Sequence, residues 1–281
     1  MGSILLQGFV HTAASILYAG LAVHFWRTRW QAASRLPTTP PLHSWERSAI
    51  LVPFGLHTLL VTQALFGSTE LRFGFGHALS VMLWLAVLLH WIESLFYRIE
   101  GMQAPVLAVA AICAPLPALF PGLPGSAYTA TMEFRVHLAL GMIAYGLFTI
   151  AALHALLMAL LERRLHGGAL SGPYAALPPL LTMEQLLFRI IGVGFIMLTL
   201  TLVTGAVFSE TLFGRAMQFN HKTVFAVASW LIFGALLVGR HGYGWRGRNA
   251  LRWTLAGFVT LLLAYVGSRF VLEVILRRGL G

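Results

Sequence analysis

The 281-residue chain is 58% hydrophobic and only 10% charged, whereas a soluble domain carries roughly a quarter charged residues. This composition excludes a soluble globular protein, and the continuous apolar runs argue against the alternating strands of a β-barrel. The net charge of +10 comes from eighteen arginines and one lysine spread over short loops. It therefore indicates membrane topology and gives no reason to expect nucleic-acid binding. The single Cys113 excludes an internal disulfide and a cysteine-based metal site.

Apolar segments that approach or reach the ~20 residues needed to cross a bilayer fill most of the chain. In chain order they cover residues 4–26, 49–66, 75–96, 104–120, 136–161, 190–212, 222–239 and 250–272. We predict an all-α polytopic bundle of about eight transmembrane helices, forming one domain over residues 1–281. The first segment follows a start without basic residues, so we expect a retained span and not a cleaved signal peptide.

The fourth segment is the weakest, because Pro105, Pro115 and Pro117 interrupt it. If it only re-entered the membrane, the topology after it would invert. With eight crossings, twelve of the nineteen basic residues fall on one side. The positive-inside rule assigns that side to the cytoplasm, so we predict that both termini lie outside.

Several histidines fall toward the predicted outer face. His77, His137 and His221 lie at the outer ends of the third, fifth and seventh segments, His11 lies in the outer half of the first, and His57 lies near the middle of the second. Haem iron is held by imidazoles that project from facing helices, so these side chains are candidate haem ligands. Each of them could also simply bond a neighbouring group, and for His57 that would be a serine or threonine across helices.

Charged residues on the same side suit a haem site. Glu133 precedes His137 by one helical turn and could orient a ligating ring, or it could form an ordinary solvated pair. Arginine suits planar carboxylates, so basic residues on this side could meet haem propionates; these are Arg72, Arg135, Arg215 and Lys222. Glu93, near the inner end of the third segment, is interpreted as a helix-end anchor.

Three sequence motifs carry a family resemblance. His137 is followed by Leu-Ala-Leu-Gly-Met-Ile-Ala-Tyr, residues 213–223 read Phe-Gly-Arg-Ala-Met-Gln-Phe-Asn-His-Lys-Thr, and residues 239–248 read Gly-Arg-His-Gly-Tyr-Gly-Trp-Arg-Gly-Arg. This text resembles the CcsA-type cytochrome c assembly proteins, in particular their YpjD/HemX-like branch. The resemblance implies a multi-pass protein of the bacterial inner membrane that handles haem for cytochrome c biogenesis.

The chain also departs from that family. Haem-delivering members carry a Trp-Asp segment and a second external histidine near the end of the chain. This chain has no aspartate, and residues 267–270 read Gly-Ser-Arg-Phe. The resemblance therefore implies His137 as one external ligand but leaves its partner open. His221, which enters on the same face, is our hypothesis for that partner, and His241 lies near a membrane histidine of the family.

Three functions remain open from the sequence. The first is haem b binding or handling at the outer face, with His137 and His221 as axial ligands and other cytochrome c assembly proteins as partners. The second is a non-haem membrane partner or regulatory subunit that keeps the fold. A small-molecule transporter is the third, but no inverted repeat supports it. No nucleophile–base pair or phosphate loop is visible, so we expect binding or handling of haem and not turnover.

Overall fold

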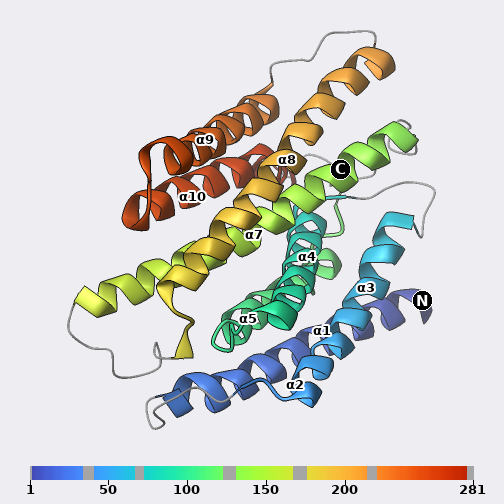
Figure 1. Ribbon diagram of the computed structural model, residues 1–281. Helices are drawn as coiled ribbons and strands as arrows, with labels where there is room; N and C mark the ends of the chain where they lie inside the picture. The colour runs from blue at the N-terminus through green and yellow to red at the C-terminus, as the bar shows by residue number, and fades with distance from the viewer. Residues whose placement is uncertain are drawn as a thin grey trace.

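The computed structural model describes residues 2–33, 41–66, 73–122, 131–166, 176–213 and 220–276, and within these ranges the chain is helical and has no strand. Figure 1 shows long helices that run side by side in alternating directions. They are α1 (Gly2–Phe25), which continues into a π-helical turn (Trp26–Gln31), α2 (Ser44–Ala49), α3 (Leu51–Phe66), α4 (Phe75–Phe96), α5 (Gln103–Cys113), α6 (Leu116–Leu119), α7 (Met132–His166), α8 (Leu180–Phe213), α9 (His221–Tyr243) and α10 (Gly247–Leu262). Short helical turns follow α10 as η4 (Leu263–Gly267), α11 (Ser268–Phe270) and η5 (Val271–Ile275).

Seven helical stretches in the described residues are long and apolar enough to cross a membrane. They contain 22 to 33 residues and overlap seven of the predicted spans, although the helix at the predicted span 190–212 already begins at Leu180: Gln7–Gln31, Ser44–Phe66, Phe75–Phe96, Met132–Arg164, Leu180–Ser209, His221–Tyr243 and Gly247–Ile275. The all-α polytopic membrane bundle is thereby confirmed. Only the fourth predicted segment is shorter; it forms α5 and α6 within Gln103–Leu119.

The break between α5 and α6 falls at the predicted prolines. Pro115 caps α6, and Pro117 lies in its first turn, where a missing backbone N–H costs little. The stretch nevertheless runs antiparallel to the whole of α4. It begins within seven residues of the end of α4, and at its other end the ring of Phe120 lies 4.7 Å from the ring of Phe75, the first residue of α4. The segment thus extends from one end of α4 to the other, as the predicted alternation of eight passes requires, although it is shorter than the seven long spans.

Both ends of the described chain lie at one end of the bundle. The backbone N–H of Phe75 donates to the carboxylate of Glu273 at 3.3 Å, so the last helical turn meets the start of α4. Nδ1 of His11 in α1 lies 2.9 Å from the carbonyl of Ala114, next to α6. This agrees with the predicted placement of both termini on one side. That this side is the outer one stays a prediction from the arginines.

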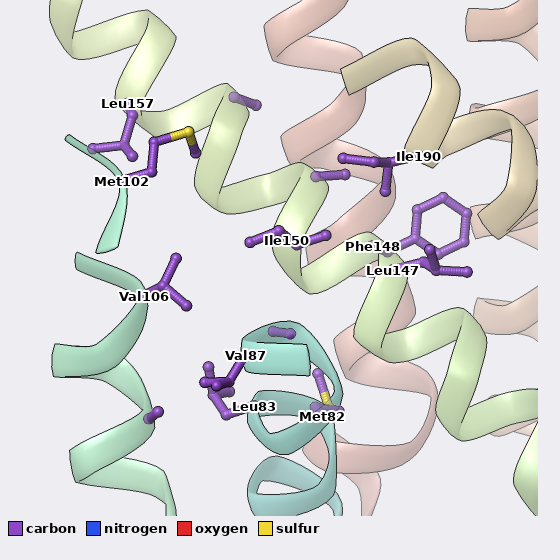
Figure 2. Close-up of a cluster of buried hydrophobic side chains, with 14 of the residues drawn as sticks. Met82, Leu83, Val87, Met102, Val106, Leu147, Phe148, Ile150, Leu157 and Ile190 are labelled. Atoms are coloured by element: carbon purple, nitrogen blue, oxygen red, sulfur yellow. The ribbon is translucent and has the colours of Figure 1, made fainter. Parts of the chain in front are cut away.

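Helix α7 forms the centre of the bundle. Of the residues in the apolar core of this span, 72% are buried inside the protein, whereas the share is 17–44% in the other six spans. Figure 2 shows side chains of α4, α5 and α8 converging on it; the labelled residues are Met82, Leu83, Val87, Met102, Val106, Leu147, Phe148, Ile150, Leu157 and Ile190. The outer helices keep apolar side chains exposed, among them Ile196, Val203, Val238 and Val259. Such a surface suits lipid tails.

A close helix contact gives a direct test of this core. A Cβ atom on Gly146 of α7 would lie 2.5 Å from Cβ of Leu85 in α4, whereas a Cβ on Gly192 of α8 would meet nothing within 4 Å. We expect Gly146→Ala to lower the unfolding free energy by about 1–3 kcal/mol, because overpacking pushes the helices apart. The matched variant Gly192→Ala should be neutral or slightly stabilising. Thermal unfolding in detergent measures both, and equal melting temperatures would contradict the packing.

Candidate functional site

His137 is held in one defined orientation near the start of α7, at the end of the bundle that carries both chain ends and that we call the outer end after the prediction from the arginines. The ring is half-buried against α8, and its Nδ1 lies 3.1 Å from Oγ1 of Thr204. The Thr204 hydroxyl already donates its hydrogen to the carbonyl of Leu200 at 2.8 Å. With the Thr204 hydroxyl donating to Leu200, Nδ1 of His137 is assigned as the donor in this pair, and the lone pair of Nε2 is then available for a ligand.

Close packing on α8 supports this orientation. A Cβ atom on Gly205 would lie only 3.0 Å from Cε1 of His137. A larger side chain at position 205 would therefore displace the imidazole ring. Glu133, the predicted orienting group, is exposed, and the described contacts give Nδ1 to Thr204 instead. No sequence pattern points to this threonine, because it lies 67 residues away.

His221 is the first residue of α9 and is exposed. The helix is capped just before it, where the side chain of Asn220 accepts a hydrogen bond from the backbone N–H of Thr223 at 3.1 Å. No described hydrogen bond, ion pair or ring contact involves His221, and none joins it to His137. The structure thus leaves this imidazole exposed without bringing it to His137, and the pairing of the two stays a prediction.

Of the four predicted basic residues, two lie in the part of the chain that the structure describes. The guanidinium of Arg135 lies 5.9 Å from the centre of the Phe66 ring at the end of α3, while Lys222 is half-buried at the start of α9 and lies within electrostatic range of Arg269. Both therefore lie at the end of the bundle that carries His137 and His221. Arg72 and Arg215 lie outside the described residues.

The other three predicted histidines come together on a different set of helices. His11 of α1, His57 of α3 and His77 of α4 are all buried, with exposed fractions of 9%, 0% and 8%. His57 and His77 each lie within electrostatic range of His11. Nε2 of His57 is hydrogen-bonded to Oγ of Ser80 at 2.8 Å, which is the cross-helix serine contact considered from the sequence.

This N-terminal histidine cluster, formed by His11, His57 and His77, retains unused polar atoms. Nδ1 of His57, Nδ1 of His77 and the hydroxyl of Tyr18 are buried without a hydrogen-bond partner, and the edge of the Tyr18 ring faces His57. Among the described residues, no three His, Cys, Asp or Glu side chains are gathered at metal-ligand distances. The cluster thus holds histidines that face one another but no preformed multi-ligand ion site.

The Gly-Arg-His-Gly-Tyr-Gly-Trp-Arg-Gly-Arg motif lies at the opposite, inner end and fastens three helices. Arg240 contacts Glu184 of α8 at 2.7 Å, and Arg248 contacts Glu162 of α7 at 3.3 Å. The chain turns between α9 and α10 at Gly244, whose φ of +65° suits glycine. His241 is exposed there, and its Nδ1 lies 2.8 Å from the carbonyl of Leu237. The motif positions helices and offers no further ligand to the outer end.

Sequence comparison agrees with this architecture. Residues 51–276 match the family described as "Cytochrome C assembly protein", a stretch that contains five of the seven long spans, most of Ser44–Phe66 and both sequence motifs of the carboxy-terminal half. The chain belongs to the cytochrome c assembly protein family. Its placement as a multi-pass protein of the bacterial inner membrane follows from the family, the long apolar helices and an inner-membrane relative.

Individual relatives cover parts of the chain. The "Inner membrane protein YpjD" of Escherichia coli K12 is 38% identical over 146 residues, which is 52% of this chain and 54% of the relative. An uncharacterized 28.8 kDa protein of Azospirillum brasilense is 32% identical over 64% of this chain and 66% of its own length. The "Cytochrome c biogenesis protein CcsA" of Prochlorococcus marinus (strain MIT 9515) is 36% identical over 32% of this chain and 28% of the relative. The chain thus spans about half the length of the YpjD relatives it matches.

Proposed function

We propose that this protein binds haem b at the outer end of the bundle and handles it for cytochrome c biogenesis. The observation that carries the proposal is the state of His137, whose Nδ1–H is committed to Thr204 so that Nε2 is free to ligate iron. A ligating histidine commonly has its second nitrogen held in this way. Similarity to a relative named "Cytochrome c biogenesis protein CcsA" also supports a role in cytochrome c biogenesis.

The residues at this end fit the group. Haem iron accepts two imidazoles, one on each face, and His221 is exposed at the start of α9, where it is our choice for the second ligand. Arg135 and Lys222 at the same end supply positive charge for the two propionates. Bound haem would contribute its iron and porphyrin, while the protein supplies the ligands and the neutralising charge.

The proposal is tested by the reduced-minus-oxidised spectrum of the protein purified after expression with ample haem. We expect a Soret band and b-type bands in the wild type, and at least a tenfold loss of bound haem in His137→Ala and in His221→Ala. His241→Ala is the matched control, because it removes an exposed histidine at the inner end and should retain the spectrum.

Two results would overturn the assignment. Absence of a Soret band together with a stably co-purified protein would favour the non-haem partner or regulatory subunit. A spectrum that persists in both His137→Ala and His221→Ala would transfer the site to the N-terminal histidine cluster. Each variant is first checked for its helical content and elution volume, so that a folding defect is not counted as loss of haem.

A further inference from the structure

A second group of buried polar side chains lies nearer the inner end, between α4 and α7. His90 and Glu93 are three residues apart and therefore share one face of α4, and His154 of α7 faces them. Oε2 of Glu93 lies 3.8 Å from Nδ1 of His90 and 3.7 Å from Nε2 of His154. His90 and His154 are 2% and 0% exposed, and the Glu93 side chain is 11% exposed. Glu93 is thus part of a buried group and not a simple helix-end anchor.

Most polar side-chain atoms of this group have no hydrogen-bond partner. Nδ1 of His154 donates to the carbonyl of Ile150 at 2.9 Å, so in the neutral ring Nε2 carries a lone pair that faces the Glu93 carboxylate. Both nitrogens of His90, Nε2 of His154 and Oε2 of Glu93 have no hydrogen-bond partner. Buried groups left in this condition cost free energy.

A cation between the three side chains would remove that cost. Separations of 3.7 and 3.8 Å exceed a hydrogen bond, but two donors that are each ~2.1 Å from one metal in a tetrahedron are roughly 3.4 Å apart. No three donors in the described part of the chain already stand at ligand distances, but each of the two histidine–carboxylate separations exceeds that value by only a few tenths of an ångström. Two histidines and a carboxylate form a common donor set for zinc and for non-haem iron.

We propose that His90, Glu93 and His154 bind one divalent transition-metal ion of the zinc or iron class inside the bundle. The carbonyl of Ile150 fixes the ring of His154, as second-layer partners do for metal-ligating histidines. The ion lies at the opposite end from His137 and does not depend on haem binding there.

Buried apolar side chains surround the three proposed ligands. Val87 precedes His90 by three residues, and Ile150 and Leu157 flank His154 at helical spacing, so they lie on the same faces. These three side chains are buried at 1%, 0% and 4% exposure and converge in the space shown in Figure 2. These neighbours make the surroundings of the three donors apolar and shield them from solvent.

In this proposal an ion enters from the inner side. A cavity of about 210 Å³ lies at the inner end of α4 and is lined by Ser94, Tyr97 and Gln103, among others. Ser94 follows His90 by four residues and so continues the same helix face. Gln103 is 1% exposed, and both polar atoms of its amide lack a partner, which makes it a polar step along this route.

The test is titration of the purified, chelator-treated protein with Co²⁺, whose visible absorption reports its ligands, followed by displacement with Zn²⁺. We expect one equivalent per chain in the wild type and at least tenfold weaker binding in Glu93→Gln and His154→Ala. His241→Ala is the control, since its Nδ1 makes the same kind of carbonyl contact but no carboxylate faces it; binding should be unchanged.

A gain-of-signal variant covers the case in which the others fold poorly. In His90→Cys, a bound Co²⁺ should acquire a sulfur-to-metal charge-transfer band in the near ultraviolet. The proposal is overturned by the absence of a stoichiometric Co²⁺ spectrum in the wild type, which would fit a shared proton instead. It is equally overturned by binding that Glu93→Gln leaves unchanged. Loss of haem in the His137 variant would affect neither result.

Discussion

Glu46→Ala is expected to lower the free energy of unfolding by about 3–5 kcal/mol, because removing one partner of a buried ion pair leaves the other charge uncompensated. Arg29 and Glu46 are only 3% and 2% exposed, and Nη2 of Arg29 lies 2.5 Å from Oε2 of Glu46. The carboxylate also contacts Nε2 of His24 at 2.9 Å and accepts the backbone N–H of His43 at 2.9 Å. Its loss releases α2 from the end of the first span.

Chemical unfolding in detergent measures this effect, and a surface ion pair provides the control. Arg98 contacts Glu100 at 3.3 Å, and the side chain of Arg98 is 77% exposed, so Arg98→Ala should cost no more than about 1 kcal/mol. If the two variants unfolded alike, burial of the Arg29–Glu46 pair would not be the source of its contribution.

The spans could be predicted from the sequence because apolar length alone decides whether a helix crosses a bilayer. The break at Pro115 was also predictable, since proline removes a backbone donor. The packing of α5 and α6 along α4 was not, because it depends on contacts such as the one between Phe120 and Phe75. The π-helical turn at Trp26–Gln31 likewise follows from packing, including the Trp30 indole that donates to the carbonyl of Gly101 at 2.7 Å.

The candidate sites could likewise be predicted from the sequence only in part. Helical spacing assigns each histidine a height along its span but does not reveal the helix that it faces. His137 bonds Thr204 of α8 where local spacing favoured Glu133, because tertiary packing turned the ring toward α8. His90 and His154 are far apart in sequence, so only the approach of α4 to α7 brings both to Glu93.

Phe233 connects the helices that carry the two proposed haem ligands. Its side chain is fully buried, and its ring stacks on Phe148 of α7 with centroids 3.8 Å apart. On the other side, a Cβ atom on Gly257 of α10 would lie 2.8 Å from the ring, so the residue fills the junction of α7, α9 and α10. The relative position of His137 on α7 and of α9 therefore depends on this ring.

Phe233→Ala is expected to lower the free energy of unfolding by about 3–5 kcal/mol, because it opens a cavity in a tightly packed junction. Leu231→Ala on the same helix is the matched control. Leu231 is 57% exposed, and lipid or detergent tails can replace its contacts, so its cost should stay below about 1 kcal/mol. Unfolding curves in detergent measure both variants.

The difference in unfolding free energy between these two variants distinguishes the contribution of close packing from that of apolar burial. Lipid tails are as apolar as the protein interior, so helices in a membrane associate through van der Waals contact and not through exclusion of water. A lipid tail cannot enter the closed space between Phe148 and Gly257, and the lost contacts are not regained. If haem lies between α7 and α9, Phe233→Ala should also lower its retention while Leu231→Ala retains it. Equal retention would place the haem away from this junction.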